Sequence, residues 1–218
     1  MRHRQKVRQT LLASPFSGAE LLDLLAQDSE IEKLFAADSG VAEGYSVRQH
    51  TERVYQVFYQ QLPYFAGEFA ALPGIDGVGL LKFVLALHDI GKPLAIRAEG
   101  KHAQHDYTLP ILVNQMELFG FARSEIQLAC ALIGHDEVGR FLKGKTQLEE
   151  CATGILRYGL RSGIGIADFF ALQTFYYTVD AGSYRFLRQR VFTEEEGPLR
   201  PRDPRFSELR QKVLSYQV

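Results

Sequence analysis

The chain has 218 residues, which is enough for one large domain with a hydrophobic core. Of these residues 46% are hydrophobic and 23% charged, the balance of a globular protein, and the formal net charge of −1 excludes a general attraction to nucleic acid or anionic membranes. Cys130 and Cys151 are too few for a disulfide framework and indicate buried residues in a reducing compartment. The basic start lacks the apolar stretch of a secretory signal, and Val78–Leu87 is shorter than the roughly 20 apolar residues of a membrane span. We therefore expect a cytoplasmic protein.

Helical periodicity dominates the first half of the chain. The expected elements are a basic segment over 1–16, either frayed or a short amphipathic helix, and helices over 21–25, over 31–35 after caps at Asp28-Ser29, and over 47–62 ended by Pro63. A further helix is expected to open at Gly74–Gly77 and to reach His88-Asp89. The last of these is apolar nearly all round, which predicts a central position in the fold. His88 and Asp89 follow it directly. We expect Gly91 to adopt the left-handed conformation there and Pro93 to prevent continuation of the helix.

The second half of the chain also predicts helices. A loop is expected over 95–104, followed by helices over 107–119 with Pro110 in the first turn and Gly120 at the end, 125–133, 136–142, 148–160, 166–180 and 206–216. Alternating strand patterns are scarce, and no linker divides the sequence. The pattern therefore predicts an all-α fold, a single globular domain over 1–218 with about eight to ten helices.

The pair His88-Asp89 is unusual because it follows so apolar a helix. An unpaired carboxylate in an apolar site costs several kcal/mol or becomes protonated, so Asp89 needs compensation. A bound metal would supply it. An ion pair with Lys92 or with an arginine is the simpler alternative, in which His88 interacts with the helix dipole.

Other imidazoles and carboxylates occupy comparable places among the chain's 6 histidines and its acidic residues. His50 lies on the apolar face of its helix, His105 directly precedes a helix, His135 stands at a helix break, and Asp180 ends an aromatic run. Such placements predict that they converge on one interior site. Imidazole and carboxylate ligands without thiolate suit a divalent metal, with Fe, Mn, Zn, Ni, Co and Mg all left open, and exclude a cysteine-type structural zinc site.

The ordered set His50, His88-Asp89 and Asp180, with LHDIGKP around the pair and GYSVRQHTERV at the first histidine, resembles the HD-domain superfamily of metal-dependent phosphohydrolases. The resemblance covers about 45–183 and implies an all-helical HD-like core, with helices in 1–44 and 206–216 packed on it. It implies one metal held by His50, His88, Asp89 and Asp180. In members with two further histidines, a second metal would be held by Asp89, His105 and His135. His102 is the alternative to His105, and Asp168 is the alternative to Asp180.

The function that the resemblance implies is hydrolysis of a phosphomonoester or phosphodiester, on a nucleotide or another small molecule. Asp89 would hold the metal and orient the attacking water, and Lys92 would act on the phosphate. Arg140 and Arg185 are further candidates for substrate binding. Two alternatives remain: a di-iron oxygenase on the same helical scaffold, and a non-catalytic regulatory domain that binds a ligand.

The expected partner is a small-molecule phosphoester. Neither a membrane nor a nucleic acid is expected, because the arginines of the C-terminal region alternate with Glu194–Glu196, Asp203 and Glu208 and form no basic stripe. A monomer and a homodimer both remain open.

Overall fold

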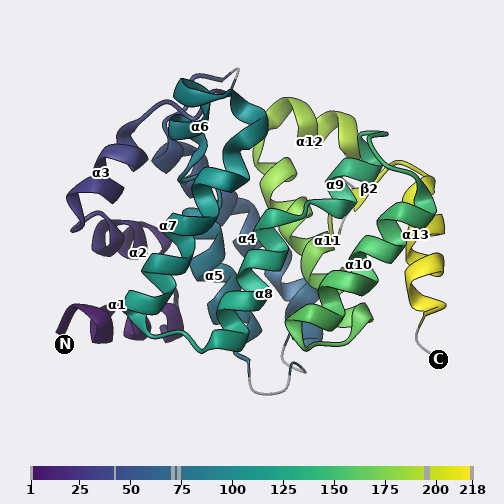
Figure 1. Cartoon of the computed structure of the whole chain (residues 1–218), viewed down its shortest axis with the longest axis horizontal. Helices are drawn as coiled ribbons and strands as arrows, with labels where there is room; N and C mark the ends of the chain where they lie inside the picture. Colours follow the sequence, from purple (N-terminus) through teal and green to yellow (C-terminus); the bar gives the residue numbers. More distant parts are fainter. Residues whose placement is uncertain (1, 42, 70–71, 73–74, 194–196, 217–218) are drawn as a thin grey trace. The chain divides into compact units, whose positions relative to one another are not determined.

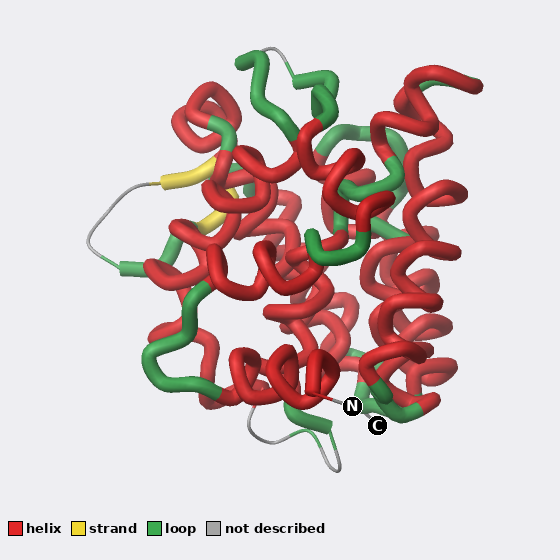
Figure 2. The backbone as a smooth tube through the Cα atoms, turned by 90° about the vertical axis from the view of Figure 1, so that its left-hand side faces the viewer, coloured by secondary structure: helices red, strands yellow, loops and turns green. Residues whose placement is uncertain are grey.

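The computed structural model describes residues 2–41, 43–69, 72, 75–193 and 197–216, so Gly74, at the expected start of a helix, and Glu194–Glu196 lie outside it. The described chain is helical almost throughout, with one pair of two-residue strands, drawn yellow in Figure 2. This confirms the all-α fold class. No helix among the described residues has the length and hydropathy needed to cross a bilayer. Two compact units make up the chain, residues 1–55 with 79–134 and residues 56–78 with 135–218, and the single-domain organisation stays a prediction.

The first unit contains α1 (Arg2–Leu12), α2 (Gly18–Leu25), α3 (Ser29–Ala36), the start of α4 (Val47–Phe69), most of α5 (Gly77–Leu87), α6 (Lys92–Ala98), the 3-10 helix η1 (Lys101–Ala103), α7 (Gln104–Phe119) and α8 (Arg123–Gly134). α7 packs against α1, α6 and α8, and Figure 1 shows α7 and α8 side by side. The helices predicted near 21–25 and 31–35 are present, and Asp28 caps the second of them.

α5 is buried, as its apolar sequence predicts: Leu81, Phe83, Val84, Leu85 and Leu87 are all 0% exposed. The charged group of its one lysine, Lys82, has partners within the first unit. The Lys82 ammonium donates to the Leu11 carbonyl at 2.6 Å and lies 4.6 Å from the centre of the Phe16 ring. A cation at the last carbonyls of a helix is stabilising, so Lys82 caps the C-terminal end of α1.

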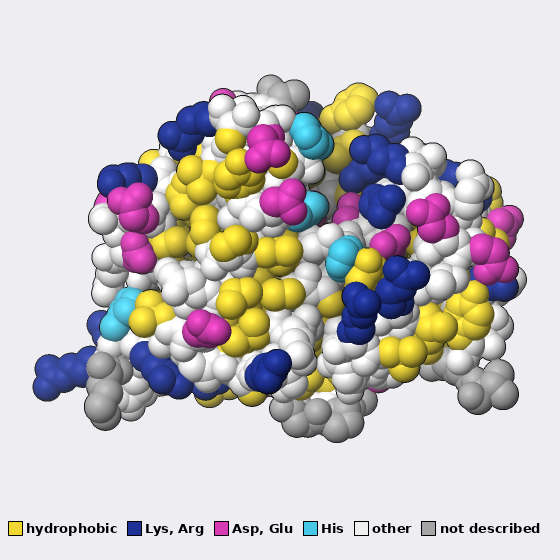
Figure 3. Space-filling view, viewed as in Figure 1, with side chains coloured by type: hydrophobic (Ala, Val, Ile, Leu, Met, Phe, Trp, Pro, Cys, Tyr) yellow, Lys and Arg dark blue, Asp and Glu magenta, His cyan; other side chains and the backbone are white. Residues whose placement is uncertain are grey.

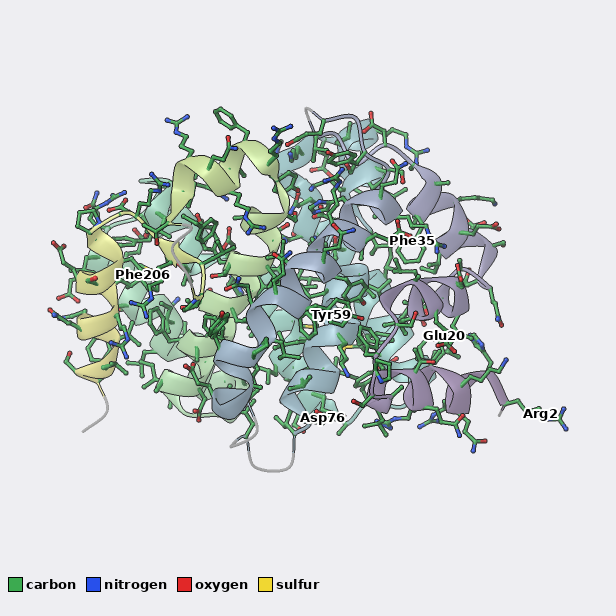
Figure 4. The ribbon with its side chains drawn as sticks, turned by 180° about the vertical axis from the view of Figure 1, so that it is seen from behind. Arg2, Glu20, Phe35, Tyr59, Asp76 and Phe206 are labelled. Atoms are coloured by element: carbon green, nitrogen blue, oxygen red, sulfur yellow. The ribbon has the colours of Figure 1, made fainter. Side chains whose placement is uncertain are left out.

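The basic start of the chain is a helix, and the alternative of a frayed end is wrong. Arg4 and Arg8 of α1 donate to the carbonyls of Phe119 and Gly120, each at 3.1 Å, where α7 ends. Arg2 extends away from the ribbon (Figure 4). Gly120 has a φ of 73° and ends α7 in the left-handed conformation, as predicted.

The second unit contains the rest of α4, α9 (Glu137–Leu142), α10 (Leu148–Ser162), α11 (Ile166–Ser183), α12 (Arg185–Val191), the strands β1 (Phe192–Thr193) and β2 (Arg200–Pro201), and α13 (Arg205–Leu214). The strands are antiparallel, with Phe192 opposite Pro201. α10 packs against α11 and α13, and Phe206 of α13, labelled in Figure 4, stacks on Phe170 with 5.9 Å between ring centres.

Pro63 does not end α4, which continues to Phe69. A proline inside a helix removes one backbone hydrogen bond. The aromatic residues of the following turns offset this loss, because the rings of Phe65 and Phe69 each lie 5.0 Å from the ring of Phe175. Packing within the second unit therefore outweighs the local signal.

The loop expected over 95–104 is also wrong, since α6, η1 and the start of α7 occupy it. Pro93 lies in the first turn of α6, where its missing N–H costs no hydrogen bond. Proline here starts a new helix directly after the turn of residues 88–91. This arrangement fixes the region that carries His88 and Asp89.

Candidate metal centre

The candidate centre lies in the first unit, where α5 ends and α6 begins. His88 and Asp89 occupy the turn between these helices, and His50 lies in the first turns of α4. All three side chains are buried, with residue exposures of 1%, 3% and 0% in that order. Two imidazoles and a carboxylate thus meet inside an apolar shell, where an uncompensated charge would be costly.

One oxygen of Asp89 faces both histidines. Asp89 Oδ2 lies 3.3 Å from His50 Nε2 and 3.7 Å from His88 Nε2, and the two Nε2 atoms are 3.2 Å apart. Nitrogen and oxygen ligands lie about 2.0–2.2 Å from a zinc ion, so tetrahedral ligands are about 3.4 Å from one another. The three atoms therefore have the spacing of ligands that share one ion, and this buried group could hold a metal.

A backbone carbonyl sets the tautomer of His88. His88 Nδ1 lies 2.8 Å from the carbonyl oxygen of Leu85, which can only accept, so Nδ1 carries the proton. In the neutral ring Nε2 then carries a lone pair, and it lies 3.7 Å from Asp89 Oδ2 and 3.2 Å from His50 Nε2. A hydrogen bond to the outer nitrogen is the usual way to orient a metal-ligating histidine. This partner was not predicted from the sequence, although His88 follows Leu85 by three residues at the end of a helix.

Lys92 forms an ion pair with Asp89 through the same Oδ2 atom. Both side chains are nearly inaccessible, at 4% exposure for Lys92 and 3% for Asp89. The ion-pair alternative considered for Asp89 is thus present in the structure, together with the cluster that could hold a metal.

Gly91 holds this turn against α7. Its N–H donates to Thr108 Oγ1 at 3.1 Å, and a Cβ at Gly91 would lie 2.3 Å from the Thr108 nitrogen. The predicted left-handed conformation is wrong: Gly91 has a φ of −84° and ψ of −11°. Glycine is required here by the close approach of two backbones.

The remaining predicted ligands are distributed over both units. His105 is half-buried in the first turn of α7, and the exposed His102 lies in η1 of the same first unit. Among the described residues, the only group with metal-ligand spacing is His50, His88 and Asp89. His105 is outside that group, and it stays a predicted ligand.

His135 and Asp180 belong to the second unit and also stay predicted ligands. His135 precedes α9, and its ring stacks on Tyr158 with 3.7 Å between ring centres. Its carbonyl accepts a hydrogen bond from Gln173 Nε2. Asp180 lies in the last turn of α11, and the alternative ligand, Asp168, lies in the first turn.

Burial raises the pKa of two carboxylates that follow His135 in the second unit. Burial raises the pKa of Asp136, opposed by Lys143 at 3.4 Å, and the charge of Asp180 raises it further. Burial likewise raises the pKa of Glu137, opposed by Arg140, and its side chain is 6% exposed. Gly154 makes room for Glu137, since a Cβ there would meet the carboxylate at 2.9 Å.

We expect Glu137→Gln to stabilise the folded protein more at pH 7 than at pH 4. Because the folded-state pKa of Glu137 is raised, ionisation penalises the folded state: the penalty is absent below the ordinary pKa of about 4.5 and grows as pH rises through the folded-state value. The variant's gain in free energy of unfolding should therefore be larger at pH 7 than at pH 4, measured by urea unfolding. Glu117→Gln, at an exposed position, is the control. An equal effect of Glu137→Gln at both pH values would contradict the prediction.

The two arginines proposed for substrate binding are exposed. Arg140 lies in α9, 3.9 Å from Glu137, and Arg185 is the first residue of α12. On the face drawn in Figure 3, basic and acidic side chains are interspersed. Both roles stay predictions.

Comparison of the chain with protein-family models, with curated proteins and with solved structures finds no match. The resemblance to the HD-domain superfamily therefore rests on the sequence motifs alone.

Proposed function

We propose that this protein is a metal-dependent hydrolase of small phosphoesters, with His50, His88 and Asp89 as metal ligands. The observation that supports it is the buried triad, in which His50 Nε2 and His88 Nε2 lie within 3.7 Å of the Asp89 carboxylate. A divalent metal bound there would lower the pKa of a water molecule and neutralise phosphoryl oxygens. His105, His135 and Asp180 are proposed as additional ligands.

In the proposed reaction, the oxygen of water forms a bond to phosphorus and the ester P–O bond breaks. The proton of the water passes to the leaving alkoxide, so that an alcohol and phosphate, or a phosphomonoester from a diester, are the products. Asp89 is proposed to orient this water through its carboxylate. Lys92, Arg140 and Arg185 are proposed to bind the phosphate.

The test is metal removal and reloading. Protein treated with a chelator should not hydrolyse p-nitrophenyl phosphate or bis-p-nitrophenyl phosphate, and Mn²⁺, Fe²⁺, Co²⁺, Ni²⁺, Zn²⁺ or Mg²⁺ should restore activity in at least one case. His3→Ala, at a histidine in α1, should behave as the wild type, whereas His88→Ala should be inactive. Metal analysis gives the number of ions per chain. Undiminished activity after chelation, or none with any metal, would refute the proposal.

A second candidate follows from the same ligands. It is the di-iron oxygenase, in which His105 and His135 would hold a second iron together with Asp89. Iron retained after aerobic purification, with consumption of oxygen and no hydrolysis of either phosphoester, would favour this candidate. Tight ligand binding without turnover would instead favour a regulatory domain.

A further inference from the structure

Lys92 competes for the oxygen that a metal would need. Its ammonium contacts Asp89 Oδ2, the atom that lies 3.3 Å from His50 Nε2 and 3.7 Å from His88 Nε2. Lys92 and Asp89 are each 3% exposed as whole residues, so water contributes little to compensating either charge. The protein thus holds a positive charge of its own at the carboxylate of the ligand group.

We infer that Lys92 is the counter-ion of Asp89 in the metal-free protein, that a divalent metal displaces it from Oδ2, and that the lysine thereby sets the metal affinity. This inference rests on the proposed metal site. Two electrostatic effects act in the same direction. The ion pair stabilises the metal-free state, and the nearby ammonium repels a dication in the bound state. Both weaken metal binding.

The backbone around Lys92 is fixed, so the exchange involves the side chain. The Lys92 N–H donates to the Asp89 carbonyl at 3.0 Å, and Gly91 is bound to Thr108 of α7. The four-carbon stem of lysine is flexible and can move its ammonium while its Cα stays in place. The displaced ammonium needs a new anion, which the phosphoryl group of the proposed substrate would supply.

The inference is tested by the Mn²⁺ affinity of chelator-treated protein, measured by titration calorimetry. Lys92→Gln keeps a hydrogen-bond donor for Asp89 and removes the charge, and it should bind Mn²⁺ at least about tenfold more tightly than the wild type. Lys92→Arg keeps the charge and should stay within about threefold of the wild type. Mn²⁺ should also raise the unfolding midpoint of Lys92→Gln more than that of the wild type, which provides a second measurement if the metal-free variant is unstable.

Equal or weaker Mn²⁺ binding by Lys92→Gln would overturn the inference while leaving the proposed function intact. Absence of Mn²⁺ binding in the wild type and in both variants would overturn the inference and contradict the proposed metal site. A Lys92→Gln protein that unfolds without Mn²⁺ and folds with it would support the inference, and one that stays unfolded in Mn²⁺ would overturn it.

Discussion

An Asp89→Asn variant is expected to bind divalent metal at least about 100-fold more weakly than the wild type, more than is typical for loss of a group that only orients a ligand. The substitution keeps the size of the side chain but replaces an anionic oxygen by a neutral amide. Only His50 and His88 of the buried triad then remain as ligands. Titration calorimetry with Mn²⁺ measures the loss of affinity, and the phosphatase activity proposed above should disappear with it.

The same substitution should destabilise the fold, because it leaves the Lys92 ammonium buried without its carboxylate. Removing one partner of a buried ion pair costs about 3–5 kcal/mol. The double variant Asp89→Asn/Lys92→Gln has no such charge, so it should recover most of the free energy of unfolding but none of the metal affinity. This matched pair separates ligand loss from unfolding. Metal binding by Asp89→Asn within about tenfold of the wild type would contradict its role as a ligand.

Local signals predicted the helices whose ends are determined by a few neighbouring residues. Asp28 caps α3 by accepting from the N–H groups of Glu30 and Ile31, and Gly120 ends α7 with a positive φ. The predicted helix ends were wrong where contacts with residues distant in the sequence determine them. α4 continues beyond Pro63 because its last turns pack on Phe175, a residue more than a hundred positions away in the sequence. α12, which has no buried residues, was not predicted from the sequence.

For the candidate site, the sequence predicted which residues are buried but not how their atoms are arranged. Helical spacing places His50 on an apolar face, and the apolar run before His88-Asp89 puts that pair at a buried end. Neither signal contains the distances between atoms, and the Leu85 carbonyl that orients His88 has no sequence signature of its own. The structure also places Lys92 on Asp89, where the sequence offered a choice between a phosphate-binding lysine and an ion pair.

The sequence predicted that a glycine is needed at position 91, but for a reason that the structure does not support. Glycine after a helix usually indicates a left-handed residue, and the sequence supports that interpretation. The observed φ of −84° is open to any residue, so conformation alone would allow alanine. The restriction comes from α7, whose backbone passes the Gly91 Cα too closely for a side chain.

Gly91→Ala is therefore expected to lower the free energy of unfolding by about 3 kcal/mol. The new methyl group would lie 2.4 Å from the Tyr107 carbonyl carbon and 2.3 Å from the Thr108 nitrogen, and backbone atoms cannot rotate away. Relief requires the turn to move from α7, which would displace His88 and Asp89 and weaken Mn²⁺ binding. Urea unfolding measures the first effect, and calorimetry measures the second.

Gly67→Ala is the matched control for this substitution. Gly67 lies inside α4, and a Cβ there meets nothing within 4 Å, so helix propensity alone should act and stabilise the protein by up to about 1 kcal/mol. The two glycine-to-alanine changes should thus differ in sign. The prediction would be wrong if the free energy of unfolding of Gly91→Ala lay within about 0.5 kcal/mol of the wild-type value and Mn²⁺ bound equally well. The contact with α7 would then not hold the His88-Asp89 turn in place.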